Sequence, residues 1–256
     1  IGDEPFQIKS KFKDIRVAVC EKRKTGIERI TAELPETEVI LLDDAFQRRH
    51  VKAGLNILLI DSSHPIWRDC ILPFGRMREN IKGIERADIA IMTKCNNLTT
   101  REYDACVNHI RAIKDVPVFF TRMQYGELYP LFGCSTKKVT KKTEVLLITG
   151  IARPEPLKKE IARRYGKVSV MKYADHHNFT ATDLEKIEER YRNIKNDNKI
   201  IITTEKDATR IIEHTGTPQT VKENIYVLPI EVEFLNEKEM FNKMILDYVT
   251  ENSRNG

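Results

Sequence analysis

Two adjacent carboxylates, Asp43 and Asp44, follow directly on an apolar run at residues 39–42. The run is long enough for one buried strand, and because side chains alternate across a strand, the two carboxylates would leave its carboxyl end in different directions. In open α/β sheets that end faces the crevice where ligands bind, and carboxylate oxygens are ligands that Mg²⁺ prefers. The segment is therefore typical of a Walker-B-type Mg²⁺ site, although a strand that ends in an acidic turn would have the same pattern.

Short apolar runs recur along the chain, with helical segments between them. Several runs are apolar throughout, as strands covered by helices on both faces must be. Thr99 and Thr182 are each followed three residues later by a glutamate, a pattern typical of the capping box at a helix start. The alternation predicts an α/β fold with a mainly parallel sheet. The predicted strands cover residues 15–20, 39–43, 57–61, 89–93, 116–120, 144–149, 168–173, 199–203 and 225–230.

A change in composition at residues 133–143 suggests where the chain divides. This segment contains four lysines and has neither helical nor strand periodicity. We therefore expect a first domain over residues 1–138 and a second, smaller α/β domain over residues 139–256.

Length and composition exclude several classes of protein. The chain has 256 residues, 41% of them hydrophobic, which is enough to bury a sizeable core. No stretch approaches the roughly 18 apolar residues of a membrane span, and the first residues lack the pattern of a secretory signal. The five cysteines are scattered without a Cys-x-x-Cys pair, which argues against a disulfide framework or a zinc site and favours a reducing cytoplasm.

The basic residues leave a second class of function open, that of a non-catalytic module that binds an anionic lipid or nucleic acid. The net charge is only +5, but basic side chains gather at residues 22–24, 48–50, 137–142 and 163–164. Most such clusters are simply solvated. Aromatic residues make up 7% and are not interleaved with the clusters, so specific reading of nucleic acid is not expected. A hydrolase ranks last, because no Gly-x-Ser-x-Gly motif is present.

A phosphate-binding loop of the form Gly-x-x-x-x-Gly-Lys-[Ser/Thr] is absent from the 256 residues. That loop holds nucleotide phosphates with backbone N–H groups at a helix N-terminus. Lys24-Thr25-Gly26 has related residue types in the wrong order and lacks the upstream glycine. Taken alone, this counts against kinase activity of these residues by themselves.

Six motifs nevertheless occur in a diagnostic order. The chain resembles the tetraacyldisaccharide 4′-kinase family, the lipid A 4′-kinases of Gram-negative bacteria, from its first residue to about residue 229. In that family a membrane-associated helix and a P-loop precede Gly-Asp-Glu-Pro, so the chain looks like the family's protein without its leading portion, and we expect negligible activity from it alone. The motifs are Gly2-Asp3-Glu4-Pro5, Asp43-Asp44-Ala45-Phe46-Gln47, residues 72–79 (LPFGRMRE), Gly150-Ile151-Ala152-x-Pro154, Ala174-Asp175-His176 and Thr204-Glu205-Lys206-Asp207-Ala208.

The resemblance implies a fold, a reaction and a cellular location. We expect a sheet of the P-loop-kinase type, incomplete at the N-terminus, and transfer of phosphate from ATP, with Mg²⁺, to the 4′-hydroxyl of tetraacyldisaccharide 1-phosphate in lipid A biosynthesis. The expected location is the cytoplasmic face of the inner membrane, with the protein peripheral to it and without nucleic acid. The oligomeric state does not follow from the sequence.

The resemblance also assigns roles to the acidic residues and the histidine. Asp3 is the expected base that takes the proton of the acceptor hydroxyl, since a carboxylate suffices for a loose transition state. Asp43 and Asp44 are expected to hold Mg²⁺. His176 is expected to pair with Asp44, although a single histidine in a loop is commonly an ordinary surface residue. His177 lies outside the clear match.

Further positions match the family near the acceptor and the nucleotide. Arg78 and Glu79 are expected at the catalytic site, where a guanidinium can bind two phosphate oxygens at once. Arg23 is assigned to substrate phosphate, with a solvated helix face as the alternative, and Gln47 to the shape of the acidic loop. The segment Thr204-Glu205-Lys206-Asp207 is expected on the nucleotide side of the site, but its carboxylates could instead cap the helix that follows.

Two departures from the family pattern bear on the fine shape of the site. Ala45 replaces a usual glycine, so the loop after Asp44 must differ or be strained if that position needs a positive φ. Asn80 replaces a usual proline at the end of the 72–79 motif. Both changes leave the acidic pair and Arg78-Glu79 intact.

Overall fold

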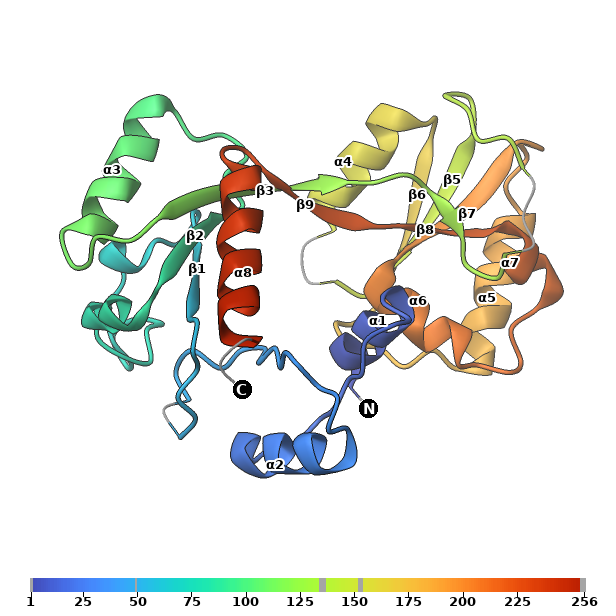
Figure 1. The fold of residues 1–256 in the computed structure, drawn as a ribbon. Helices are drawn as coiled ribbons and strands as arrows, with labels where there is room; N and C mark the ends of the chain where they lie inside the picture. Colours follow the sequence, from blue (N-terminus) through green and yellow to red (C-terminus); the bar gives the residue numbers. More distant parts are fainter. Residues whose placement is uncertain (1, 49, 134–136, 152–153, 254–256) are drawn as a thin grey trace. The chain divides into compact units, whose positions relative to one another are not determined.

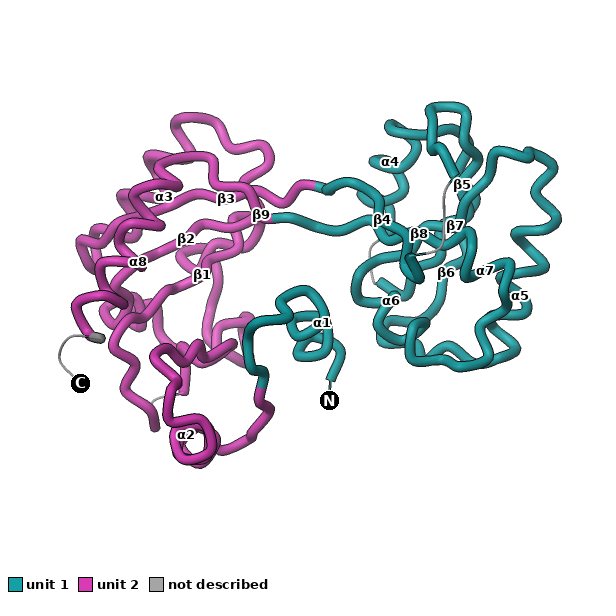
Figure 2. The backbone as a smooth tube through the Cα atoms, turned by 45° about the vertical axis from the view of Figure 1, so that its right-hand side comes forward, with its two compact units in different colours: residues 1–17, 125–231 teal, residues 18–124, 232–256 magenta. Residues whose placement is uncertain are grey.

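The computed structural model describes residues 2–48, 50–133, 137–151 and 154–253. The chain forms two compact units, which Figure 2 distinguishes by colour. Unit 1 comprises Ile1–Val17 and Tyr125–Glu231, and unit 2 comprises Ala18–Gln124 and Val232–Gly256. This division differs from the one expected at residue 138, because the lysine-rich segment 133–143 lies inside unit 1. Cys134 and Arg49, named among the cysteines and the basic clusters, lie outside the described residues.

Unit 2 is built on a four-stranded sheet with the order β1-β2-β3-β9 (Figure 1). The first three strands run parallel, with Ile57 opposite Ile89 and Ala90 opposite Val118. The elements of this unit are α2 (Arg23–Glu33), β1 (Ile57–Asp61), the 3₁₀ helices η1 (Ile66–Arg68) and η2 (Ile81–Arg86), β2 (Ile89–Thr93), α3 (Thr100–Arg111), β3 (Val118–Tyr125), β9 (Ile230–Phe234) and α8 (Lys238–Ser253).

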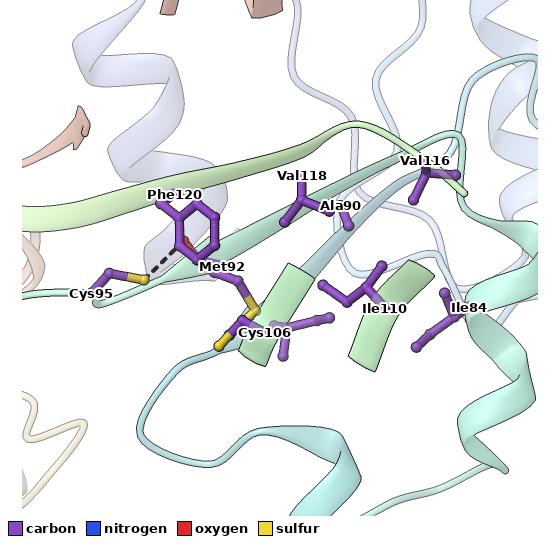
Figure 3. Packing of buried hydrophobic residues seen from close by; sticks show 10 residues of the cluster. Ile84, Ala90, Met92, Cys95, Cys106, Ile110, Val116, Val118 and Phe120 are labelled. Carbon is purple, nitrogen blue, oxygen red and sulfur yellow. Dashed lines mark hydrogen bonds between the residues drawn. The ribbon is translucent and has the colours of Figure 1, made fainter. Parts of the chain in front are cut away.

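Alternation along β2 gives unit 2 two apolar layers, one on each face of its sheet. Ala90 and Met92 point to the layer that contains α3, where Cys106 and Ile110 pack against them (Figure 3). The intervening Ile89 and Ile91 belong to the layer on the other face, with Phe119 and residues of α8. Because both faces are buried, β2 is apolar throughout, as its sequence predicts.

Unit 1 is built on a five-stranded sheet with the order β4-β8-β7-β5-β6. Strands β6, β5, β7 and β8 are parallel, and the short β4 is antiparallel to β8. The elements are α1 (Asp3–Lys11), β4 (Tyr129–Pro130), β5 (Glu144–Thr149), α4 (Glu155–Arg164), β6 (Val168–Lys172), α5 (Ala181–Arg192), β7 (Lys199–Thr204), α6 (Glu205–Ile212), α7 (Gln219–Asn224) and β8 (Ile225–Leu228).

The core of unit 1 is also divided into two apolar layers, one on each face of its sheet. On β5, Leu146 and Ile148 pack with residues of α5, α6 and α7, whereas Val145 and Leu147 pack with residues of α4 on the opposite face. Helices therefore cover both faces of the central strands, which holds the carboxyl ends of those strands in fixed positions. Across the described residues of both units, no helix combines the length and the apolar character needed to cross a bilayer.

Most of the predicted strands are confirmed, and three of them match the observed bounds: residues 57–61, 89–93 and 144–149. The run at 225–230 is divided at Pro229, which has no N–H to donate, so that β8 ends at Leu228 and β9 begins at Ile230. The capping box at Thr99 and Glu102 is confirmed. The box predicted at Thr182 is wrong, because Thr180 caps α5.

Two predicted strands, at residues 15–20 and 39–43, are wrong, since neither segment is a strand in the described structure. Val39 is 47% exposed and Leu41 is 90% exposed. A strand needs a neighbour to accept and donate its backbone hydrogen bonds, and no described strand lies beside either segment. The apolar pattern alone therefore overstates the burial of these residues.

Candidate functional site

Three motifs of the sequence meet at one edge of the sheet in unit 1. Strand β5 is followed by Gly150, β6 by the loop that carries Asp175 and His176, and β7 by Thr204 at the start of α6. These strands are parallel neighbours, so their carboxyl ends lie at the same edge, where α/β sheets bind ligands. The N-terminal helix α1 packs against α6 at this edge (Figure 1). It brings Asp3, from the other end of unit 1's sequence, into the same group.

Asp3 is held by Arg210 of α6. Arg210 Nε donates to Asp3 Oδ1 at 3.0 Å, and Arg210 Nη2 donates to Asp3 Oδ2. The Arg210 side chain is only 7% exposed, and that of Asp3 is 24% exposed. The Arg210 hydrogen bonds lower the pKa of Asp3, against the opposing effect of partial burial. The Asp3 carboxylate is therefore ionised at neutral pH and fixed in orientation.

His176 lies between Asp3 and Lys206. Its Nδ1 is 3.1 Å from Asp3 Oδ2, and its Nε2 is 3.1 Å from Lys206 Nζ. The lysine ammonium can only donate, so Nε2 must supply a lone pair. Nδ1 lies between Asp3 Oδ2, which can only accept, and Arg210 Nη2, which is 3.1 Å away and can only donate. His176 has a φ of 59°, and the left-handed backbone turns its ring toward the two partners.

Lys206 also binds Asp175, with Nζ 3.0 Å from Asp175 Oδ1. The lysine lowers the pKa of Asp175. On a helix, residues four positions apart lie on the same face, which is why Lys206 and Arg210 both face this group. Asp3, Asp175, His176, Lys206 and Arg210 are called the acid–base cluster below. The His176 side chain is 63% exposed, so solvent or a ligand can reach it.

Asp207 stabilises the segments that carry the cluster. It is fully buried, and its Oδ2 accepts from the Gly150 N–H at 3.0 Å and from Thr204 Oγ1 at 2.8 Å. A side chain at Gly150 would place its Cβ 2.7 Å from the Ala174 carbonyl oxygen and 3.0 Å from Asp207 Oδ1. The Gly150 motif thus permits the close approach of the two loops.

The predicted nucleotide-side segment has a clear local role. Thr204 caps α6 by accepting from the Asp207 N–H, and Glu205 accepts from Lys11 Nζ at 3.2 Å, which ties α1 to α6. The cap of α6 is therefore the Thr204 hydroxyl and not one of the carboxylates, while Lys206 belongs to the acid–base cluster. Contact of this segment with a nucleotide stays a prediction.

The acidic pair lies in unit 2, in a turn. Asp43 and Asp44 are both exposed, and Asp44 has a φ of 47°. The positive φ falls on Asp44, so Ala45 escapes the strain expected from the loss of a glycine. Arg23, the first residue of α2, donates to the carbonyl of Cys20 at 2.5 Å and to that of Asp43 at 3.5 Å. It thereby holds the turn to the start of the helix.

The donor set of this turn fits a hydrated Mg²⁺ ion. Among the described residues, no group of three or more His, Cys, Asp or Glu side chains is placed to hold a metal ion. Mg²⁺ usually binds only one or two carboxylates and keeps waters and phosphate oxygens as its other ligands. Asp43 and Asp44 can supply those carboxylates, because both side chains are exposed.

The remaining predicted residues of unit 2 flank a charged pair that the sequence pattern did not reveal. Arg86 Nη2 donates to Glu79 Oε1 at 2.6 Å and to the Phe46 carbonyl at 3.4 Å, and its guanidinium lies 4.9 Å from the centre of the Phe46 ring. Arg86 thus joins the loop after the acidic pair to Glu79. Gln47 and Arg78 are exposed on either side. An open hollow of about 300 Å³ lies against Glu79 and Arg86.

Sequence analysis missed three residues of these groups. Asp175 lies within a recognised motif but received no role, and Arg210 and Arg86 lie outside every motif. A signal for Arg210 existed, since it follows Lys206 by one helical turn. No local signal identifies Arg86, whose partners come from other segments. The predicted pairing of His176 with Asp44 joins residues of different units and stays a prediction.

Comparison with known families gives a match over nearly the whole chain. Residues 1–250 match the family described as Tetraacyldisaccharide-1-P 4′-kinase. The tetraacyldisaccharide 4′-kinase of Bacteroides fragilis strain YCH46 is 45% identical over 266 aligned residues, which cover 100% of this chain and 71% of the relative. The enzyme of the same name from Phocaeicola vulgatus is 44% identical, with 100% of this chain and 72% of the relative covered.

The fold matches that of a solved structure. The crystal structure of LpxK from Aquifex aeolicus, described as an apo form in complex with ATP, superposes with a TM-score of 0.65. The match covers 97% of this chain and 69% of that one, at 23% sequence identity. It confirms the predicted α/β fold with mainly parallel sheets.

Proposed function

The chain belongs to the tetraacyldisaccharide-1-P 4′-kinase family, and on this basis we propose that it carries the acceptor side and the metal side of a lipid A 4′-kinase. The reaction is transfer of the terminal phosphoryl group of ATP to the 4′-hydroxyl of tetraacyldisaccharide 1-phosphate. The use of ATP is supported by the Aquifex aeolicus neighbour, whose crystal structure is of a complex with ATP. The expected location is the cytoplasmic face of the inner membrane, peripheral to it.

The observation that carries this proposal is the position of Asp3, shared between Arg210 and His176. An alcohol keeps its proton at neutral pH, so a base must take it as the phosphoryl group arrives. A carboxylate is a sufficient base when the transition state is loose. Arg210 keeps Asp3 ionised, and a carboxylate has about four lone-pair sites, so Asp3 retains room to accept the proton of the acceptor.

The other members of the acid–base cluster position this base. Lys206 Nζ lies 3.1 Å from His176 Nε2, and His176 Nδ1 lies 3.1 Å from Asp3 Oδ2, so the ring is held next to the carboxylate. His176 and Arg210 therefore hold the same oxygen from two directions, and rotation of the carboxylate is restricted. A base held in this way does not have to be reoriented when the acceptor binds.

Residues of unit 2 supply the remaining parts. Asp43 and Asp44 would hold Mg²⁺, which neutralises charge on the ATP phosphates when it is bound. Arg78 is assigned to the transferred phosphate and Glu79 to the same site, where Arg86 fixes its orientation. Arg23 and Gln47 are assigned to the acceptor, with Arg23 acting through the turn that it holds.

These 256 residues alone should turn over ATP very slowly. They contain no Gly-x-x-x-x-Gly-Lys-[Ser/Thr] loop, and a nucleotide bound without such a loop lacks the backbone N–H groups that hold its phosphates. The decisive protein is a chimera in which this chain replaces the matching 71% of the Bacteroides fragilis relative. With Mg·ATP and the disaccharide acceptor, it should form the 4′-phosphorylated product, whereas the 256 residues alone should form almost none.

Substitution of Asp3 in the chimera tests the role of the base. Asp3→Ala should reduce kcat by at least about 100-fold, the usual contribution of a positioned general base, and Glu4→Gln should leave it unchanged. A folded chimera that makes no product would contradict the kinase proposal. Retention of most activity by Asp3→Ala would remove Asp3 from the role of base but leave the family reaction in place.

The alternative of a basic binding module predicts a different response to salt and metal. Its binding would weaken steeply with ionic strength, would not need Mg²⁺ and would ignore substitutions at Asp43 or Asp44. One basic cluster is partly neutralised, because Arg163 and Arg164 share the carboxylate of Glu160, at 2.7 and 2.6 Å. This contact favours the kinase over the module.

A further inference from the structure

A loop in unit 2 presents apolar side chains to solvent. Ile71 is 44% exposed, Leu72 is 57% exposed and Phe74 is 92% exposed. These three residues are called the apolar tip. An exposed phenylalanine beside two aliphatic side chains is unusual on a protein surface unless something covers it. The tip belongs to the 72–79 motif, of which only Arg78 and Glu79 received a role above.

The loop is held in this shape by its own hydrogen bonds. The Leu72 N–H donates to the Met77 carbonyl at 2.9 Å, and the Met77 N–H donates to the Cys70 carbonyl at 3.0 Å. Asp69 Oδ1 accepts from the N–H groups of Cys70 and Arg76, at 2.8 and 3.1 Å.

Gly75 allows the loop to close on itself. A Cβ there would lie 2.2 Å from the Cys70 carbonyl oxygen, so no other residue fits without moving the backbone. The exposure of the tip is thus built into a closed loop.

The charges around the tip favour an anionic partner. Arg68, Arg76 and Arg78 are exposed, and Asp69 is the one acidic residue between positions 68 and 78. The Arg76 side chain is 70% exposed. Arginines next to exposed aromatic and aliphatic side chains are the arrangement of segments that lie at a membrane interface, with apolar groups among the acyl chains and guanidinium groups among the phosphates.

We propose that the apolar tip inserts into the interfacial region of an anionic lipid bilayer. The exposed arginines of the loop match the charge of lipid phosphates and the exposed apolar side chains match the acyl chains, so a bilayer surface suits both. The meaning of this insertion for catalysis rests on the proposed function, because a lipid acceptor must be reached at a membrane.

Vesicle binding of the 256-residue chain tests the proposal without ATP or acceptor. Binding should be stronger to vesicles of phosphatidylcholine mixed with phosphatidylglycerol than to phosphatidylcholine alone. Phe74→Ser should weaken binding about tenfold, as expected when one large apolar side chain is no longer buried. Arg76→Gln should weaken binding to the anionic vesicles about fivefold, the contribution of one basic residue near such a surface, and should have little effect on neutral ones.

Leu246→Ser is the matched control, because Leu246 of α8 is 64% exposed in the same unit but lies outside the loop. It should bind vesicles as the unchanged chain does. Phe74→Trp gives a direct signal, since its emission should shift to the blue on binding and be quenched by lipids brominated in the acyl chains. The emission of the unchanged chain, which comes from Trp67 alone, provides the baseline.

Several results would overturn the proposal. One is that the emission of Phe74→Trp does not shift to the blue at lipid excess. Another is that Phe74→Ser and Leu246→Ser lose vesicle binding equally. A third is that Phe74→Ser abolishes a dimer of the unchanged chain but leaves vesicle binding as it was. The last result would assign the tip to a protein contact. In the chimera, Phe74→Ser should keep its activity on detergent-dispersed acceptor, so failure of membrane insertion can be told from failure of the kinase proposal.

Discussion

Removal of the charge on Asp3 should loosen α1 from α6. Helix α1 contains no fully buried residue, although Pro5, Phe6 and Gln7 are half-buried. Polar contacts at its two ends therefore contribute much of its attachment: Asp3 with Arg210 and His176, and Lys11 with Glu205. Hydrogen bonds to charged groups contribute about 1.5–3 kcal/mol each. Asp3 makes two of them but is partly exposed, so we expect Asp3→Asn to cost about 2 kcal/mol of the free energy that opposes opening of α1.

Hydrogen exchange of the α1 amides measures this opening. A loss of about 2 kcal/mol corresponds to about 30-fold faster exchange. Tryptophan fluorescence would not report it, because the single tryptophan, Trp67, lies in unit 2. The neighbouring Glu4→Gln substitution removes an exposed charge from the same helical turn and serves as the matched control, with little change expected.

A double-mutant cycle isolates the contact from the other roles of Arg210. Asp3→Asn and Arg210→Gln should each accelerate exchange, and the double variant should be slower than their combined effect predicts, with a coupling of about 2 kcal/mol. Contacts of Arg210 with His177 and Asp207 cancel in the cycle. A coupling below about 0.5 kcal/mol, the usual limit of additivity, would refute the view that this pair anchors α1.

The same contact predicts how the anchoring depends on pH. The folded pKa of Asp3 is lowered, so the ionised form is favoured in the folded state. Its contribution is complete above the unfolded pKa of about 3.9 and is lost as the pH falls below that value and through the folded pKa. After correction for intrinsic exchange rates, protection of α1 should fall in this acidic range in the unchanged chain but not in Asp3→Asn.

Two further substitutions test the scaffold of unit 1. Burial raises the pKa of Asp183, but hydrogen bonds from Thr180 and a neighbouring histidine lower it to about 2. Asp183→Asn should therefore lower the free energy of unfolding by about 1–2 kcal/mol at neutral pH. This difference should vanish as the pH falls from about 4 toward 2. Equal urea midpoints for the two chains at neutral pH would contradict this. Gly150→Ala should lower the free energy of unfolding by about 1–3 kcal/mol, because its Cβ would lie 2.7 Å from the Ala174 carbonyl oxygen. Gly2→Ala is the control: its Cβ would have no neighbour closer than 3.8 Å, so the same urea titration should show no change.

The parts of the fold that sequence predicted correctly are mainly those where a strand is covered on both faces. Residues 89–93 and 144–149 are apolar runs bounded by polar residues, and each lies between two parallel neighbours. In such strands the local pattern and the final environment agree. Residues 57–61 were also predicted correctly, although they form an edge strand on which Leu59 is 63% exposed. Because parallel strands end at one edge, the same pattern also predicts that the motifs after β5, β6 and β7 lie close together.

The predictions that were wrong depend on which residues pack against a segment, and the local sequence does not carry that information. Residues 39–43 have the pattern of a buried strand, yet Leu41 is 90% exposed, because a run of apolar residues indicates that burial is favourable but not that a neighbour is present. Arg210 was missed for a related reason. Its partner Asp3 is 207 positions away, and only the packing of α1 on α6 joins them.

The two ring nitrogens of His176 decide between its possible carboxylate partners. Sequence comparison assigned the ring to Asp44, but Nδ1 is hydrogen-bonded to Asp3 and Nε2 to Lys206. An imidazole has only these two hydrogen-bonding atoms, so a bond to Asp44 requires that one of the present partners leaves. Loss of the contact with Lys206 would free Nε2 and leave Asp3 oriented. Loss of the contact with Asp3 would instead separate the proposed base from its histidine. Lys206→Met should therefore free Nε2 and leave the contact of Nδ1 with Asp3 in place.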